Sequence, residues 1–167
     1  MENSRLEKPA SENHSYYIRK ARLDDVKTMH AMLMSSASKG EMLPRPLNDL
    51  YGRLRDFFVL SPLDQGAVLA CCALSISWQD LCEIRSLYVD QQLRGQGWGR
   101  RLVEACLSEA LTLGCYKVFT LTYQVDFFKH LGFVHINKDQ LPHKVWADCI
   151  HCPKFPECDE IAMFMEM

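Results

Sequence analysis

One segment past the middle of the chain constrains the fold most, because it places a strand, a glycine-rich loop and a helix in direct succession. LCEIRSLYV (Leu81–Val89) predicts a strand, and DQQLRGQGWG (Asp90–Gly99) contains three glycines and leads into apolar residues at helical spacing. Arg94, Arg100 and Arg101 crowd the helix entrance, where the unpaired N–H groups and the helix dipole already make the chain positive. We therefore expect this entrance to bind an anion.

The loop does not match two familiar phosphate-binding motifs. A P-loop needs Gly-Lys-Ser/Thr, which is absent from this stretch. A dinucleotide fingerprint needs G-x-G-x-x-G after an early strand, whereas this run is G-x-G-x-G and follows four predicted strands. A glycine-rich turn with solvated arginines remains the alternative interpretation.

Hydrophobic periodicity predicts an α/β chain with a mixed sheet. A hairpin meander comes first, and a strand–helix–strand unit follows it. The predicted strands are Tyr16–Ala21, Phe57–Leu60, Ala67–Ile76, Leu81–Val89, Tyr116–Thr122, Phe133–Ile136 and Glu160–Met167. The predicted helices are Leu23–Gly40 with Asp24 as its cap, Leu47–Phe57, Gly97 to about Leu113, and Val125–Phe133.

Length and charge narrow the function classes. A chain of 167 residues suffices for one compact domain, so we expect a flexible tail over 1–15 and a single domain over 16–167. The net charge of −2 argues against a nucleic-acid binder or a membrane-surface protein, because neither has its basic field here. No stretch approaches the roughly 18 apolar residues that span a bilayer. The expected partner is a small molecule, and the oligomeric state, including a homodimer, stays open.

The eight cysteines predict a reducing compartment, because the polar N-terminus lacks the apolar core of a secretion signal. We therefore expect a cytoplasmic protein. Cys149, Cys152 and Cys158 have C-x2-C-x5-C spacing near His143, Asp148 and His151, but a second chelating pair is missing. We expect reduced packing thiols and assign no metal, with a zinc chelate and a redox-sensitive pair as alternatives. Cys71, Cys72, Cys106 and Cys115 lie in apolar runs and are expected in the core.

Two motifs carry a family resemblance. RGQGWG (Arg94–Gly99) resembles the R/Q-x-x-G-x-G/A signature of the GNAT acetyltransferases, and FFKHLGF (Phe127–Phe133) resembles that family's short helix ending in Gly-Phe. The resemblance implies an acyl-CoA N-acyltransferase fold, with a mostly antiparallel sheet that is splayed at the cofactor site and flanked by helices. It also implies acetyl-CoA as cosubstrate, with its pyrophosphate on the loop backbone. The implied cofactor contacts are Leu87, Tyr88, Val89, Arg94, Gly95, Gln96, Gly97, Trp98, Gly99, Arg100 and Phe128.

A closer resemblance is to the short, single-domain N-acetylglutamate synthases. It rests on EIRSLYV, on MLPRP (Met42–Pro46) and on the long segment LPHKVWADCIHCPKFPECDEIAM (Leu141–Met163). This resemblance implies acetylation of the α-amine of L-glutamate in arginine biosynthesis, by direct transfer in a ternary complex. Lys144 and Trp146 of the long segment are expected either to touch the substrate or to anchor a lid over it.

The resemblance also implies roles in catalysis. A backbone N–H of Leu87 or Tyr88 would stabilise the developing oxyanion, and Val89 would pair with the pantetheine arm. Glu83 would accept the proton of the amine with a pKa raised by burial, although pairing with Arg85 is the alternative. Phe128 stands where the family carries an acidic tyrosine, so Tyr123 could substitute as the acid toward the thiolate or serve in packing.

An acidic acceptor calls for cationic clamps, because a guanidinium pairs with a carboxylate through two parallel hydrogen bonds. Arg45 and Arg85 are the candidates, and Ser86 is placed to assist. Strand alternation puts Glu83 and Arg85 on one face unless a bulge intervenes. Alternatives to glutamate are another amino acid, a polyamine or a protein amine. A non-catalytic acyl-CoA sensor or interaction module is the alternative from a different class.

Overall fold

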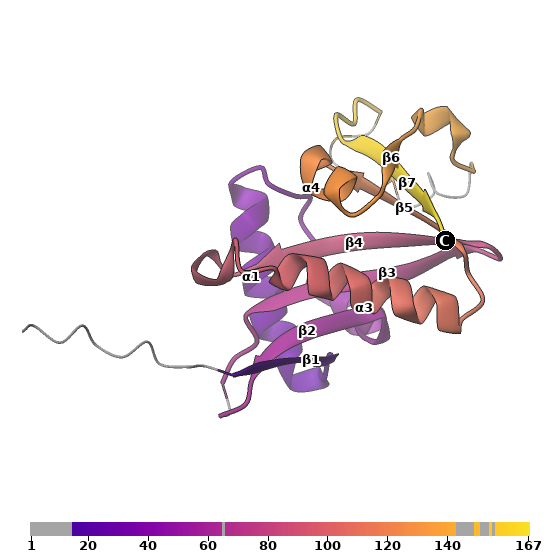
Figure 1. The fold of residues 1–167 in the computed structure, drawn as a ribbon. Helices are drawn as coiled ribbons and strands as arrows, with labels where there is room; N and C mark the ends of the chain where they lie inside the picture. Colours follow the sequence, from indigo (N-terminus) through magenta and orange to yellow (C-terminus); the bar gives the residue numbers. More distant parts are fainter. Residues whose placement is uncertain (1–14, 65, 143–148, 151–153, 155) are drawn as a thin grey trace, which may run out of the picture.

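The computed structural model describes residues 15–64, 66–142, 149–150, 154 and 156–167, so the expected tail lies outside the described residues except for Ser15. Its centre is a seven-stranded sheet with the order β1-β2-β3-β4-β5-β7-β6 (Figure 1). The strands are β1 Tyr16–Lys20, β2 Phe57–Pro62, β3 Ala70–Trp78, β4 Leu81–Val89, β5 Lys117–Thr122, β6 Val134–His135 and β7 Ile161–Glu166. The helices are α1 Val26–Ser38, α2 Leu47–Gly52, α3 Trp98–Thr112 and α4 Val125–His130.

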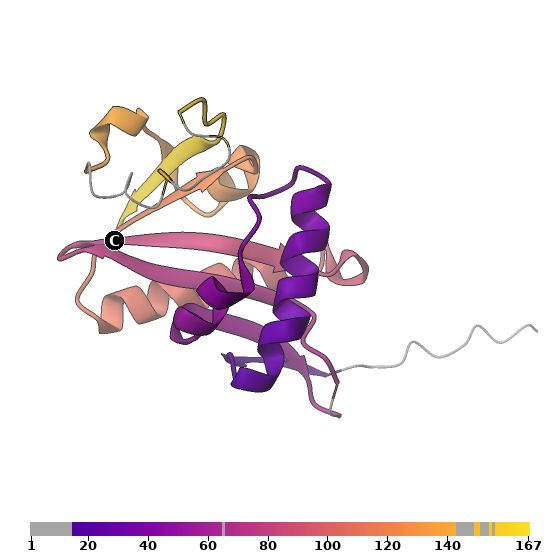
Figure 2. The same ribbon diagram turned by 180° about the vertical axis from the view of Figure 1, so that it is seen from behind.

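Helices cover both faces of the sheet. Figure 1 shows α3 across one face, and Figure 2 shows α1 and α2 across the other. The helix α3 forms because Leu102, Val103, Cys106 and Ala110 recur on one side, where they are buried against the sheet. On the opposite face Val26, Met29 and Leu33 of α1 pack in a second core with β2 and β3. No helix in the described part of the chain is long and apolar enough to cross a membrane.

The topology confirms the expected fold class. Strands β2, β3 and β4 form the antiparallel meander, and α3 connects β4 to β5 as parallel neighbours. The remaining pairs of the sheet are antiparallel. The predicted cap of α1 is displaced by one residue. Its N-cap is Asp25 rather than Asp24, and the Asp25 carboxylate is held by Arg19 at 2.6 and 3.0 Å.

The sheet splits between β4 and β5. These strands pair from Leu81 to Glu83 with Lys117 to Phe119, and β4 then runs on to Val89 without a further β5 partner among the described residues. Figure 1 shows the two strands diverging from their common end. A V-shaped opening therefore lies beside the second half of β4, as the resemblance implied.

A β-bulge reverses the faces of β4 beside this opening. Between the pairs Ala73↔Arg85 and Cys71↔Tyr88, β3 contributes one residue and β4 contributes Ser86 and Leu87. Ser86 has a φ of 55°, a left-handed conformation that is rare for a residue other than glycine. Before the bulge Cys82 and Ile84 face α3, and after it Leu87 and Val89 do. Simple alternation along the sequence does not foresee this reversal.

Candidate active site

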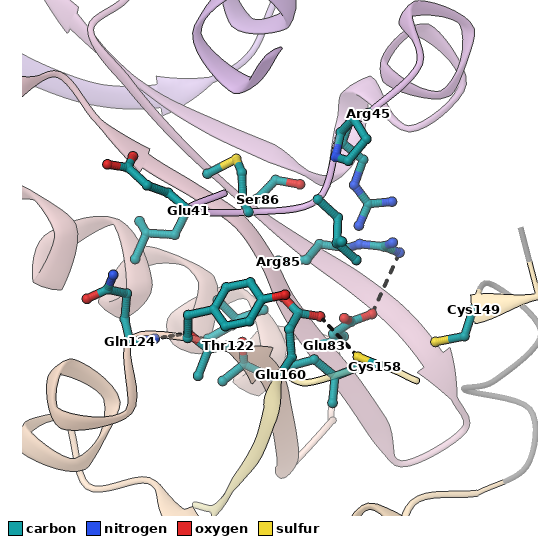
Figure 3. A pocket seen from close by; sticks show the side chains of 18 of the residues that line it. Glu41, Arg45, Glu83, Arg85, Ser86, Thr122, Gln124, Cys149, Cys158 and Glu160 are labelled. Atoms are coloured by element: carbon teal, nitrogen blue, oxygen red, sulfur yellow. Dashed lines mark hydrogen bonds and ion pairs between the residues drawn. The ribbon is translucent and has the colours of Figure 1, made fainter. Parts of the chain in front are cut away.

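A cavity of about 860 Å³ occupies the opening between β4 and β5 (Figure 3). Much of its wall comes from the connection between α1 and α2, the middle of β4, the end of β5 and the residues before β7, and α1, α2, α4 and the turn after β6 add further side chains. Seven of the residues expected to serve catalysis, cofactor or substrate lie in its wall, namely Arg45, Glu83, Arg85, Ser86, Leu87, Tyr123 and Phe128. The glycine-rich loop lies at the far end of β4, beyond the cavity wall.

Two guanidinium groups form one side of the cavity. Arg45 is presented by the loop between Pro44 and Pro46, and Arg85 by β4, with side chains that are 20% and 10% exposed. Burial and the nearby charge of Arg85 lower the pKa of Arg45. Figure 3 shows both groups directed into the same space. Like charges held together in a partly dry cavity favour the binding of an anion between them.

The carboxylates of this wall hold the guanidinium groups in place. Asp49 is shared, because it lies 3.5 Å from Nη1 of Arg45 and 3.0 Å from Nε of Arg53. Glu83 lies 3.6 Å from Nη1 of Arg85, with its own side chain 13% exposed. The expectation that Glu83 and Arg85 share a face is therefore confirmed, because the bulge comes after both. The pairing that the sequence left as an alternative for Glu83 is the arrangement found.

Glu160 is a cavity residue that the sequence did not single out. It is 8% exposed, and burial followed by the charge of Glu83 raises its pKa to about 7. The Cys158 thiol donates to Glu160 Oε2 at 3.9 Å. In the sequence, Glu160 is a charged residue at the start of a predicted strand, where exposure is the usual expectation. Its spacing of two from Ala162, which is buried in β7, is the pattern that could have indicated an inward side chain.

Tyr123 lies in a polar network at the edge of the cavity. Its hydroxyl donates to Asp159 Oδ1 at 2.6 Å and contacts Lys154 Nζ, which also lies 3.1 Å from Asp159. Burial, followed by the bond to Asp159, raises the pKa of Tyr123. Its proton is therefore directed to Asp159 rather than into the cavity. Phe128 is 3% exposed and packs edge-on against Phe127 and Phe133.

The glycine-rich loop forms an open backbone cradle. Gly95 and Gly97 have φ values of 78° and 84°, and Gly97 is the N-cap of α3, as the sequence predicted. A Cβ at either glycine would have no atom within 4 Å, so the space over this backbone is free for a ligand. The successive N–H groups and the start of a 15-residue helix suit a pyrophosphate. The loop therefore fits the acetyl-CoA that the sequence implied.

The arginine side chains of the loop are engaged by the protein itself. Arg94 donates to the Val89 carbonyl at 3.1 Å and to Glu41 Oε2 at 3.3 Å, and Arg100 donates to Glu104 at 2.7 Å. Arg101 lies over the ring of Trp98, which also contacts Tyr16 edge-on. The main chain, rather than these guanidinium groups, makes the open cradle in this structure.

The backbone of β4 beyond the bulge presents N–H groups to the opening. Asp90 N–H donates to Leu69 on the β3 side, and Tyr88 is the partner of Cys71 in β3. Because neighbouring residues of a regular strand point their N–H groups to opposite sides, that of Tyr88 faces β3 and that of Val89 turns toward the gap. Of the two residues expected to serve the oxyanion, Tyr88 is therefore engaged with β3, which leaves Leu87 in the bulge as the candidate.

Part of the cysteine-rich segment lies outside the described residues, including His143, Lys144, Trp146 and Cys152. Cys149 and Cys158 both line the cavity. Within the described residues no group of three or more histidine, cysteine, aspartate or glutamate side chains could hold a metal ion. Cys71, Cys72, Cys106 and Cys115 are buried, as predicted from their apolar neighbours.

Comparisons with known proteins agree with this geometry. The model of the acetyltransferase (GNAT) family matches residues 26–133. An uncharacterized N-acetyltransferase of Chlorobaculum tepidum is 40% identical over 146 residues, which cover 87% of this chain and 93% of that protein. An amino-acid acetyltransferase of Mycobacterium tuberculosis is 36% identical over 132 residues, which cover 78% of this chain and 75% of that protein.

The fold is also that of a solved enzyme. The N-acetylglutamate synthase of Neisseria gonorrhoeae, complexed with coenzyme A and N-acetylglutamate, superposes with a TM-score of 0.81 at 23% identity. The match covers 93% of this chain and 36% of the gonococcal chain, and it shows a common fold. The matches in sequence and fold, together with the cradle and the split sheet, lead to one conclusion. The chain belongs to the GNAT family of N-acetyltransferases, enzymes that use acetyl-CoA as the acetyl donor.

Proposed function

We propose that this enzyme acetylates the α-amine of L-glutamate, the reaction that begins arginine biosynthesis, in the cytoplasm. The observation that carries the proposal is the pair of guanidinium groups in the cavity, Arg45 and Arg85. Glutamate brings two carboxylates, and an anion between these groups offsets their mutual repulsion. The relative in Mycobacterium tuberculosis, an amino-acid acetyltransferase, supports an amino acid as the acceptor.

The cavity provides the remaining requirements of direct acetyl transfer. The N–H of Leu87, a residue of the cavity wall, would stabilise the thioester oxygen as negative charge develops. The N–H of Val89 would hold the pantetheine arm, and the backbone of Gly95–Arg100 would hold the pyrophosphate. Ser86 would add a hydroxyl contact to the acceptor. These positions leave the amine beside the carboxylates of the cavity, so no covalent acetyl-enzyme is needed.

The direct test is a thiol-release assay with acetyl-CoA and a panel of acceptors. We expect the highest kcat/KM for glutamate, with lower values for glutamine and aspartate and none above background for spermidine or a lysine peptide. Turnover of a polyamine or a peptide without turnover of glutamate would overturn the substrate assignment and leave the acetyltransferase. Binding of acetyl-CoA without turnover of any acceptor would favour the non-catalytic sensor.

A further inference from the structure

We propose that Glu160, rather than a residue of β4, accepts the proton that the acceptor amine must lose. The inference rests on the proposed function to the extent that an amine is acetylated in this cavity. It does not depend on glutamate being that amine.

The register of the sheet places Glu160 across the opening from the bulge. Strand β5 runs parallel to β4 with Glu83 beside Phe119, so the three residues that follow each of these lead to Thr122 and to Ser86 on the two sides of the opening. Thr122 in turn is the partner of Ile161 in β7. Glu160, one residue before Ile161, therefore lies on the β5–β7 side of the opening and lines the same cavity as Ser86 and Leu87. Leu87 is the residue whose N–H is proposed to serve the thioester oxygen.

The surroundings keep the Glu160 carboxyl inside the cavity and ready to take a proton. Among the described residues, the charges that act on it are those of Glu83 from β4, Arg45 from the α1–α2 connection, Lys138 from the turn after β6, and Lys154 from the segment before β7. Burial and Glu83 outweigh the three cations, so the pKa rises to about 7. A base of this strength is half ionised near neutral pH, which suits proton transfer from an amine.

Glu83 is less suited to the same task because its carboxylate is occupied. It lies 3.6 Å from Nη1 of Arg85, and both side chains are largely buried. A carboxylate that neutralises a neighbouring guanidinium loses that interaction when it takes up a proton. Glu83 is therefore a positioning residue, since it orients Arg85 and its charge makes Glu160 more basic. The Cys158 thiol donates a weak hydrogen bond of 3.9 Å to Glu160 Oε2, which contributes to the orientation of the accepting carboxylate.

The proton balance of the step is complete without any further reactant. The ammonium form of the acceptor gives one proton to Glu160, directly or through one water, and the free amine attacks the thioester carbon. A C–N bond forms and the C–S bond breaks. The second proton of the nitrogen leaves with the thiolate as CoA thiol, and Glu160 returns the first proton to solvent.

The test compares Glu160→Gln with a matched control, Glu157→Gln. Both changes remove one carboxylate from the segment before β7, but Glu157 is exposed and outside the cavity wall. We expect Glu160→Gln to lower kcat about 100-fold or more, as for loss of a general base, and to abolish the fall of kcat below about pH 7. The KM values for acetyl-CoA and the acceptor should change less than about fivefold. Glu157→Gln should behave as the wild type.

A second variant, Glu83→Gln, separates the two carboxylates. If Glu160 is the base, removal of the Glu83 charge lowers the pKa of Glu160, so the acidic limb of kcat remains and moves to lower pH. If Glu83 is the base, that limb disappears in Glu83→Gln and persists in Glu160→Gln, which would overturn the proposal. This comparison stands even if Glu160→Gln fails to fold.

Failure of the proposed function gives a different result. All pH profiles are measured with whichever acceptor the wild-type enzyme turns over fastest. A wild type that rejects glutamate but acetylates another amine refutes the substrate assignment and leaves the Glu160 comparison intact. A folded Glu160→Gln variant that retains both wild-type kcat and the acidic limb refutes the role of Glu160, whatever the acceptor.

Discussion

Arg45 and Arg85 illustrate how single residues define this cavity. Each is held by a carboxylate of its own wall, Asp49 or Glu83, so its direction is set before any substrate arrives. The pKa of Arg45 is lowered by burial and by Arg85, which means that the free site carries an electrostatic strain. A bound carboxylate would relieve that strain, whereas a cationic acceptor would add to it.

Replacement of Arg45 by methionine should therefore weaken acceptor binding selectively. We expect the KM for glutamate to rise by at least about 30-fold, on the order of 2 kcal/mol or more, because a buried carboxylate loses its partner. The KM for acetyl-CoA should stay within about twofold. Steady-state kinetics measures both, and Arg55→Met is the control, since Arg55 is exposed and lies outside the cavity. An unchanged KM for glutamate would remove Arg45 from the binding site.

The bulge in β4 decides what the strand presents to the opening. Glu83 and Arg85 point toward the α1 side, and after Ser86 the apolar Leu87 and Val89 point toward α3. Without the extra residue, Leu87 and Val89 would follow Arg85 onto the acceptor side. Under the proposed function, one strand would serve the acceptor with its side chains and the thioester with its main chain.

Substitutions of Ser86 should test this element through its backbone conformation. At a φ of 55° a β-branched side chain is strongly disfavoured, so we expect Ser86→Val to lower the free energy of unfolding by about 1–3 kcal/mol. Ser86→Gly removes the conformational penalty and should leave stability within about 1 kcal/mol of the wild type. Urea denaturation followed by circular dichroism measures both. Equal destabilisation by valine and glycine would show that the loss comes from the side chain rather than from φ.

At the scale of the whole molecule, the buried Glu160 carboxylate of the cavity lowers the free energy of unfolding. Glu160 has a pKa of about 7 in the folded state against about 4.3 when unfolded. The folded chain therefore binds the proton more tightly, and the free energy of unfolding falls as pH rises from about 4.3 to about 7. The full difference corresponds to on the order of 4 kcal/mol.

Glu160→Gln should remove this loss of stability. We expect its free energy of unfolding to exceed that of the wild type by about 2–3 kcal/mol more at pH 8 than at pH 5. Urea denaturation of both proteins at the two pH values measures the difference, with Glu157→Gln as the exposed control. A stability difference that does not vary between pH 5 and pH 8 would contradict the raised pKa of Glu160.

Short-range sequence patterns were sufficient to predict most of the helices and strands and part of the candidate site. Strand and helix periodicities depend on residues two to four positions apart, so β4 and the start of α3 follow directly from LCEIRSLYV and RGQGWG. The glycine cradle is equally local, because left-handed backbone at a helix start calls for glycine. Arg45, Glu83 and Arg85 were recognised by charge type and resemblance, and they do line one cavity.

What could not be foreseen depends on how distant segments are aligned. The bulge at Ser86 exists because β3 and β4 keep register on both sides of it, which neither strand encodes alone. Glu83 pairs with Arg85 because the fold buries both side chains at the closed end of the opening, where neither reaches solvent freely. Glu160 reaches the cavity wall through two successive strand pairings, β4 with β5 and β5 with β7. These pairings join segments that lie far apart in the sequence, so residues two to four positions apart do not specify them.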